Sequence, residues 1–180
     1  MTGYKIMDGA MGSEFVRRGL TLPGHIWSAE ANINNPEMVQ KIHREYIDTG
    51  VDYITTNTFR TTPRAYMKTG LGEEKSVQMA KGSLIQAVEH AKAAASSDVK
   101  ILGSIAPLED CYTPKLFPGK DVAILEFSQL GEWFSSANVD ILLFETMNSI
   151  AETEAGLIAI ENLDLPIWES FVLKDDHNLL

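Results

Sequence analysis

Five short hydrophobic runs along the chain each end in polar or glycine residues. They cover residues 5–9, 53–57, 101–104, 141–145 and 167–171. A nearly continuous hydrophobic run is typical of a strand in a parallel sheet whose outer face is covered by helices. The pattern therefore predicts five parallel strands, each carrying polar residues at its carboxyl end.

Stretches with helical periodicity separate most of these runs. They cover residues 35–50, 74–95, 121–136 and 150–162. The first begins with Asn35-Pro36-Glu37, which supplies a capping residue, a first-turn proline and an early acidic residue, and Gly50 ends it. Hydrophobic residues recur three and four positions apart in each stretch, as expected for helices that pack on a sheet.

This alternation of strand and helix is typical of a (β/α)8 barrel of the TIM-barrel type, whose functional groups sit at the carboxyl ends of the strands. Closing such a barrel takes eight strands and typically about 250 residues, whereas the chain has 180. We therefore expect an α/β fold truncated after about five βα units, with residues 1–180 forming the N-terminal portion of a single barrel domain. Its open sheet edges would allow self-association.

The amino-acid composition of the chain argues against nucleic acids and membranes as binding partners. The net charge of -10 argues against binding to a nucleic-acid backbone, which favours a basic surface. No hydrophobic run approaches the roughly 20 residues that span a bilayer, and residues 5–9 are not followed by the hydrophobic region of a signal peptide. The single cysteine, Cys111, excludes an internal disulfide. We expect a cytoplasmic protein with neither nucleic acid nor membrane as a partner.

The strand ends supply the candidate functional residues. Asp8 and Gly9 end the first run and Ala10 follows it. The three residues form either an ordinary turn or a carboxylate beside backbone that a ligand approaches. Asn57 ends the second run as a ligand contact or a loop cap. Glu145 follows a strongly hydrophobic run, where a carboxylate is costly unless it is paired or faces a cavity. Asp8 and Glu145 together could bind the ammonium group of a ligand through charge-assisted hydrogen bonds. They could equally serve as the acid and the base of glycoside hydrolysis.

Other polar and aromatic residues are weaker candidates. Cys111 has no partner at a zinc-like spacing. His43 and His90 lie in the helical stretches, where we predict that they face solvent. Trp27 suits a ligand wall or an aromatic side chain that closes the barrel. Ser104 is a candidate hydrogen-bonding group at the end of its strand.

Several motifs match one known family in order along the chain. They span residues 6–14, 17–20, 26–29, 55–59, 103–107, 143–147 and 168–171, with Lys174-Asp175 after the last. Together they resemble the homocysteine S-methyltransferases over essentially the whole chain. The resemblance implies a zinc-dependent (β/α)8 barrel that methylates the sulfur of homocysteine to give methionine. The methyl donor in that family is S-methylmethionine, S-adenosylmethionine, betaine or a folate.

By this resemblance, Asp8 and Glu145 hold the amino group of homocysteine. Gly9 and Ala10 match backbone positions beside the substrate, and Asn57 matches the polar tip of the second strand. The family binds zinc through cysteines that follow its sixth and later strands, and those segments are absent from the 180 residues. We therefore expect no zinc ligands in this chain, which would carry the amino-acid-binding half of the site and transfer little or no methyl group alone. The alternatives are a non-catalytic half-barrel assembly module and a two-carboxylate hydrolase.

Overall fold

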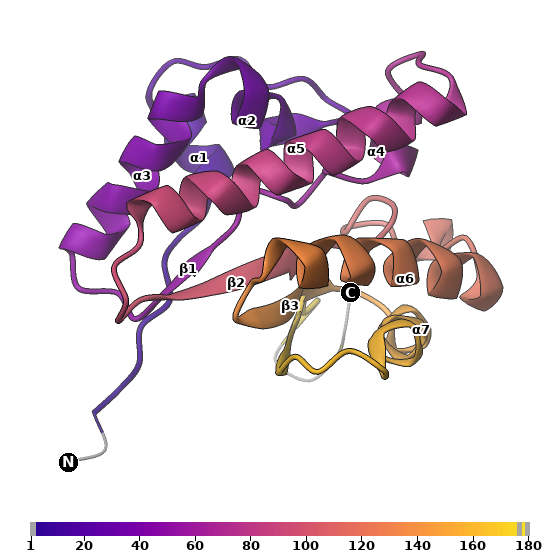
Figure 1. The fold of residues 1–180 in the computed structure, drawn as a ribbon. Helices are drawn as coiled ribbons and strands as arrows, with labels where there is room; N and C mark the ends of the chain where they lie inside the picture. The colour runs from indigo at the N-terminus through magenta and orange to yellow at the C-terminus, as the bar shows by residue number, and fades with distance from the viewer. Residues whose placement is uncertain (1–2, 176–177, 179–180) are drawn as a thin grey trace. The chain divides into compact units, whose positions relative to one another are not determined.

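Strands and helices alternate along most of the chain in a computed structural model, which describes residues 3–175 and 178 (Figure 1). The strands are β1 (Tyr53–Thr55), β2 (Lys100–Ile105), β3 (Ile141–Met147) and β4 (Ile167–Phe171). They form a parallel sheet in the order β1-β2-β3-β4, which confirms the predicted α/β class. The sheet of the described residues is not closed into a barrel.

The chain divides into two compact units, Met1–Gly103 and Ser104–Leu180. Strand β2 crosses the boundary, so its last two residues, Ser104 and Ile105, belong to the second unit. None of the helices in the described part of the chain is long and apolar enough to cross a membrane.

The first predicted strand is shorter than expected. Residues 5–9 form only an isolated parallel bridge, between Met7 and Tyr53 of β1. Ile6 O accepts hydrogen bonds from the N–H groups of Asp52 and Tyr53, and Asp8 N donates to Tyr53 O at 3.0 Å. The segment therefore runs parallel to β1, but its pairing is too short to count as a strand. Its large side chains remain exposed, Ile6 by 54% and Met7 by 44%.

Helices α3 (Pro36–Asp48) and α5 (Glu73–Ala94) confirm the first two helical predictions and pack against each other in the first unit (Figure 1). Four shorter elements were not predicted, because four to seven residues offer too few positions to reveal a helical period. They are α1 (Met11–Arg17), the 3-10 helix η1 (Trp27–Glu30), α2 (Ala31–Asn34) and α4 (Pro63–Met67). Two of them, η1 and α2, lie within the long connection after residue 19.

The prediction that His43 and His90 face solvent was wrong. His43 on α3 is 0% exposed and His90 on α5 is 6% exposed. His90 Nε2 lies 2.8 Å from Asn32 O and its Nδ1 lies 3.3 Å from Gln40 Nε2. Among the described residues, neither ring nitrogen of His43 has a hydrogen-bond partner. Burial, with a smaller contribution from His90, lowers the pKa of His43 to about 4, so the ring is neutral near pH 7.

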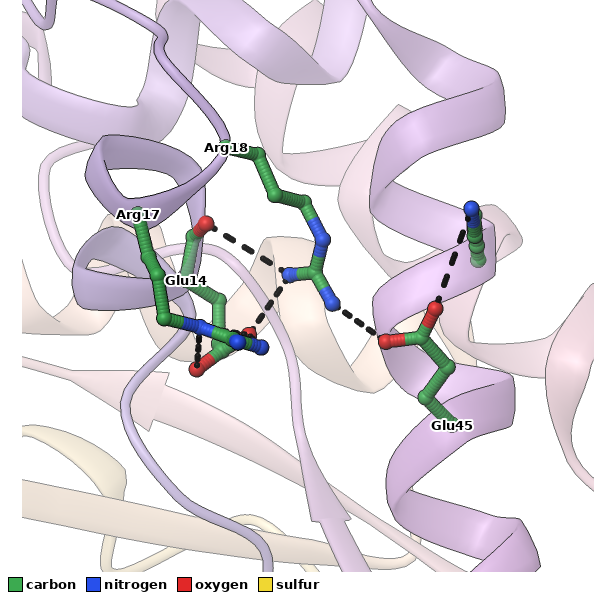
Figure 2. Close-up of polar contacts among 5 residues, drawn as sticks. Glu14, Arg17, Arg18 and Glu45 are labelled. Carbon is green, nitrogen blue, oxygen red and sulfur yellow. Dashed lines mark hydrogen bonds and ion pairs between the residues drawn. The ribbon is translucent and has the colours of Figure 1, made fainter.

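An ion-pair network links α1 to α3 (Figure 2). Glu14 accepts from Arg17 Nη2 at 2.6 Å and pairs with Arg18 Nη1 at 2.7 Å, and Arg18 also pairs with Glu45 on α3. The hydrogen bonds from Arg17 hold the pKa of Glu14 below its usual value. The network stabilises the position of the short helix that follows Asp8 and Gly9.

The second unit contains α6 (Lys120–Ala137) and α7 (Ile150–Ile160), which lie side by side (Figure 1). Both match the predicted ranges within two residues at each end. A Cβ atom on Gly131 would lie 2.8 Å from Ile160 Cγ2, and one on Gly156 would lie 2.5 Å from the Phe144 ring. These two glycines therefore let α6 approach α7 and let α7 approach β3 closely. Phe127 meets Phe144 edge to face, with ring centroids 5.5 Å apart.

Candidate functional site

Asp8 is held by Thr55 at the end of β1. The Thr55 main-chain N–H donates to Asp8 Oδ2 at 2.9 Å, and the Thr55 hydroxyl donates to Asp8 Oδ1 at 2.8 Å. Asp8 follows the bridge between Met7 and Tyr53, which places it beside the carboxyl end of β1. Two hydrogen bonds from one residue fix both the position and the orientation of this half-buried carboxylate.

Gly9 and Ala10 carry the chain from Asp8 into α1. A Cβ atom on Gly9 would lie 2.8 Å from the Tyr46 hydroxyl oxygen, so a side chain here would displace Tyr46. Burial, together with the negative charges of Glu14 and Asp8, raises the pKa of Tyr46. Ala10 is exposed and precedes the first residue of α1. The backbone of both residues is therefore open to a ligand.

Asn57 is 3% exposed and lies at the centre of a hydrogen-bond network in the first unit. Its Nδ2 donates to Ser28 O and to Asn32 Oδ1, both at 2.8 Å. Asn32 Nδ2 in turn donates to Asn57 O at 2.9 Å and to the Ser83 hydroxyl at 3.0 Å. Asn57 therefore ties the end of β1 to the segment formed by η1 and α2.

Trp27 begins that segment in a strained conformation. Its φ angle is 47°, in the left-handed region that large side chains rarely adopt, and 41% of the residue is exposed. A Cβ atom on Gly12 would lie 2.3 Å from Trp27 Nε1, so the indole ring rests on the first turn of α1. Backbone strain of this kind is concentrated at functional sites, because only the surrounding structure maintains it.

Glu145 lies in the second unit, on β3. Its Oε2 accepts a hydrogen bond from the Ser104 hydroxyl at 2.6 Å. Burial raises the pKa of the Glu145 carboxyl, while the hydrogen bond from Ser104 opposes that rise. A partly desolvated carboxylate held by one neutral donor is suited to bind a cationic group of a ligand.

The backbone at Glu145 departs from regular strand geometry. The register between β3 and β4 shifts between Phe144 and Met147, and Thr146 has a φ angle of 55°. The Thr146 N–H donates to the Ser170 hydroxyl at 3.1 Å instead of continuing the ladder. A bulge of this type redirects side chains at the end of a strand, and a threonine at positive φ is a strained conformation.

The long connection after β2, residues 106–119, is anchored to α7 and to the turn between β3 and α7. The Leu108 N–H donates to Glu152 Oε1 at 2.8 Å, and Asn148 Nδ2 donates to Cys111 O at 2.9 Å. Glu152 is 2% exposed and Cys111 is 5% exposed. Short helix η2 (Pro114–Leu116) lies within this connection. The segment is therefore ordered around buried polar anchors.

The described residues do not fit a metal centre. Across residues 3–175 and 178, no group of three or more His, Cys, Asp or Glu side chains is placed to hold a metal ion. Cys111 is buried and forms no disulfide. We therefore assign no chemical step on this chain to a metal.

Comparison with protein families gives one decisive match. The sequence model of the homocysteine S-methyltransferase family matches residues 5–180. The chain belongs to the homocysteine S-methyltransferase family. This confirms the resemblance found in the motifs, and it does not support the alternatives of an assembly module or a hydrolase.

Curated members of the homocysteine S-methyltransferase family match nearly the whole chain. Homocysteine S-methyltransferase 2 of Arabidopsis thaliana is 25% identical, and the match covers 99% of this chain and 61% of that protein. Homocysteine S-methyltransferase of Escherichia coli strain K12 is 26% identical, with 97% of this chain and 60% of that protein covered. The chain therefore spans about three-fifths of the length of these curated relatives.

Solved structures of the E. coli homocysteine methyltransferase MmuM share the fold. The oxidized form of MmuM has a TM-score of 0.85 and is 26% identical to this chain. The match covers 97% of this chain and 64% of the MmuM chain. The metallated form has a TM-score of 0.86 at 25% identity and covers 99% of this chain and 66% of that chain. In that form the E. coli protein is metallated.

The sequence analysis did not predict the hydrogen bonds that Thr55 and Ser104 form with the acidic residues of the candidate site. Thr55 suits a strand whatever its role, because β-branched residues are common there, and Ser104 was only a candidate hydrogen-bonding group. The structure pairs Thr55 with Asp8 and Ser104 with Glu145. One feature of the sequence could have indicated these bonds: a residue with a hydroxyl group lies near the end of the strand that neighbours each acidic residue.

Proposed function

We propose that this chain carries the homocysteine-binding half of a homocysteine S-methyltransferase, an enzyme that transfers a methyl group to the sulfur of homocysteine, and that it transfers little or no methyl group alone. In that reaction the thiolate attacks the methyl carbon of an activated donor. The new sulfur–carbon bond forms while the bond from methyl to donor breaks, and the bonding electrons leave with the donor. S-Methylmethionine, S-adenosylmethionine, betaine and a methylated folate are donors of this type. We also propose that both units belong to one (β/α)8 barrel and that the protein is cytoplasmic.

The observation that carries this proposal is the half-buried Glu145 carboxylate, which among the described residues accepts a side-chain hydrogen bond from one neutral donor, Ser104, in a chain of this family. Burying a carboxylate is unfavourable unless a cation compensates it. The ammonium group of an amino acid is such a cation. We assign the same role to Asp8, which Thr55 orients in the first unit.

The other predicted residues complete the proposed amino-acid site. The exposed backbone of Gly9 and Ala10 would lie beside the ligand, where a Gly9 side chain would displace Tyr46. Asn57 uses both of its amide hydrogens inside the protein. We therefore propose that Asn57 contributes by holding the segment of Trp27 in place.

Isothermal titration calorimetry with L-homocysteine tests the proposal. We expect Asp8→Asn and Glu145→Gln each to weaken binding by at least about 30-fold, because removing one partner of a desolvated charge pair costs about 2 kcal/mol or more. Asp98→Asn and Glu154→Gln remove exposed carboxylates and serve as matched controls that should keep wild-type affinity.

A second ligand isolates the contribution of the amino group. 4-Mercaptobutanoate is homocysteine without its amine, and it should bind far more weakly than homocysteine to the wild-type chain. Equal affinity for the two thiols, or full homocysteine affinity in both site variants, would contradict the proposed function.

A further inference from the structure

Ser104 is buried beside Glu145 in the second unit. The residue is 1% exposed and lies on β2, so the strand holds its hydroxyl in one place. Its donor-to-acceptor distance of 2.6 Å to Glu145 Oε2 is typical of a hydroxyl that donates to an ionised carboxylate. Across the described part of the chain, Ser104 is the one side chain that hydrogen-bonds to this carboxylate, which leaves Oε1 for a ligand.

The main chain of Glu145 is restrained as well. The Thr146 hydroxyl donates to Glu145 O at 2.7 Å, and the Thr146 N–H donates to the Ser170 hydroxyl. The bulge at Thr146 therefore sets the direction in which the Glu145 side chain leaves the strand. The hydrogen bond from Ser104 then fixes the carboxylate at the far end of that side chain.

We propose that Ser104 is a positioning residue, which orients the Glu145 carboxylate toward the amino group of homocysteine and thereby sets the lower pH limit of binding. The proposal rests on the proposed function, because it needs Glu145 to bind that amino group. Ser104 itself does not touch the substrate. It acts through Glu145.

The loss of one hydroxyl can change the pKa of Glu145 because no neighbouring charged side chain among the described residues contributes to that pKa. Charged side chains on the neighbouring elements are Lys100 on β2, Glu169 on β4, Glu152 and Glu154 on α7, and Lys120, Asp121, Glu126 and Glu132 on α6. None of them is among the causes of the shift in the Glu145 pKa. Burial raises this pKa, and the hydrogen bond from Ser104 opposes the rise. Removing the hydroxyl therefore leaves burial unopposed, and the protonated form of Glu145, which cannot pair with an ammonium group, persists to higher pH.

Carbon-13 NMR of protein labelled at the glutamate carboxyls tests the inference without any ligand. The Glu145 signal is assigned from its disappearance in Glu145→Gln, and its pKa is measured in the wild-type chain and in Ser104→Ala. We expect a further rise of this pKa in Ser104→Ala. Ser104→Cys, which substitutes a weaker donor of similar shape, should give an intermediate value.

Ser128→Ala is the matched control. The Ser128 hydroxyl donates to Ala159 O at 3.1 Å in the same unit, so this variant also loses one hydroxyl hydrogen bond. It should leave the Glu145 pKa at its wild-type value. An unchanged Glu145 pKa in Ser104→Ala, or an equal change in Ser128→Ala, would overturn the inference.

Calorimetry with L-homocysteine between pH 5 and 8 supplies the functional readout. Ser104→Ala should bind about tenfold more weakly than wild type at the acidic end, because more of its Glu145 is protonated there and cannot pair with the ammonium group, and the two affinities should converge as the pH rises. Failure of wild type to bind homocysteine would reject the proposed function, and with it this inference. Wild-type binding with an identical pH dependence in Ser104→Ala would reject the inference alone.

Discussion

The Thr55 residue donates twice to the Asp8 carboxylate, from its main-chain N–H to Oδ2 at 2.9 Å and from its hydroxyl to Oδ1 at 2.8 Å. The two residues are 47 positions apart in the chain. The pair therefore exists only because residues 5–9 run parallel to β1. It resembles the pair of Ser104 and Glu145, where a hydroxyl at one strand end also holds an acidic side chain from a neighbouring segment.

Removing the Thr55 hydroxyl should weaken homocysteine binding while the fold is retained. Thr55→Val keeps the shape of the side chain and the N–H bond to Asp8 but deletes the hydroxyl bond. We expect about a tenfold loss of affinity in calorimetry and a loss of about 1–2 kcal/mol in the free energy of unfolding, because a hydrogen bond to a charged group is removed.

A similar bond outside the site provides the control for Thr55→Val. The Thr113 hydroxyl donates to Asp110 Oδ2 at 2.7 Å on the surface of the second unit. Thr113→Val should therefore leave the affinity for homocysteine unchanged. Equal affinities in the two variants would show that the Thr55 hydroxyl does not support ligand binding.

A methyl group on Gly12 should displace the Trp27 ring. The added Cβ would lie 2.3 Å from Trp27 Nε1, a separation that neither group can keep. We expect Gly12→Ala to lose about 1–3 kcal/mol of stability through overpacking. The tryptophan emission should also shift, and that shift should be absent when Trp27 is first replaced by Phe.

Gly82→Ala is the opposite case, because a Cβ atom at Gly82 on α5 meets no described atom within 4 Å apart from the local backbone of its own helix. Alanine in a helix is favoured over glycine by about 1 kcal/mol, so this variant should be more stable than wild type. A stable Gly12→Ala protein with wild-type emission would contradict the packing of Trp27 on α1.

The buried His43 should make the protein less stable in acid. Its pKa is about 4 in the folded protein, against a usual value of 6.5, so the unfolded chain binds more protons between those two pH values. Stability should therefore fall as the pH decreases from about 6.5 to about 4, by on the order of 3 kcal/mol at most. Urea unfolding at a series of pH values measures this loss.

His43→Leu removes the titrating group and two ring nitrogens that have no hydrogen-bond partner in the described part of the chain. Its free energy of unfolding should exceed that of wild type and should vary less between pH 4 and 6.5. His25→Gln, at an exposed position, should retain the wild-type pH dependence. An identical acid-dependent loss in His43→Leu would exclude His43 as its source.

Much of the fold follows from local patterns in the sequence. The predicted helices became α3, α5, α6 and α7, and four of the five predicted strands are present. Hydrophobic periodicity depends on which residues face the core within one element, so neighbouring positions carry enough information to reveal it. The motifs around Asp8, Asn57 and Glu145 were also sufficient to identify the family. The substrate contacts assigned to these three residues stay predictions.

Tertiary structure decided the features that depend on contacts between distant segments. His43 and His90 are buried because α3 and α5 pack together, and a helical period cannot show which neighbour will cover a particular face. The hydroxyl of Ser104 meets Glu145 across 41 positions, just as Thr55 meets Asp8 across 47. The sequence by itself determined which polar groups stand at the strand ends. Their partners were decided by the register of adjacent segments, because a hydrogen bond forms only where donor and acceptor come within about 3 Å.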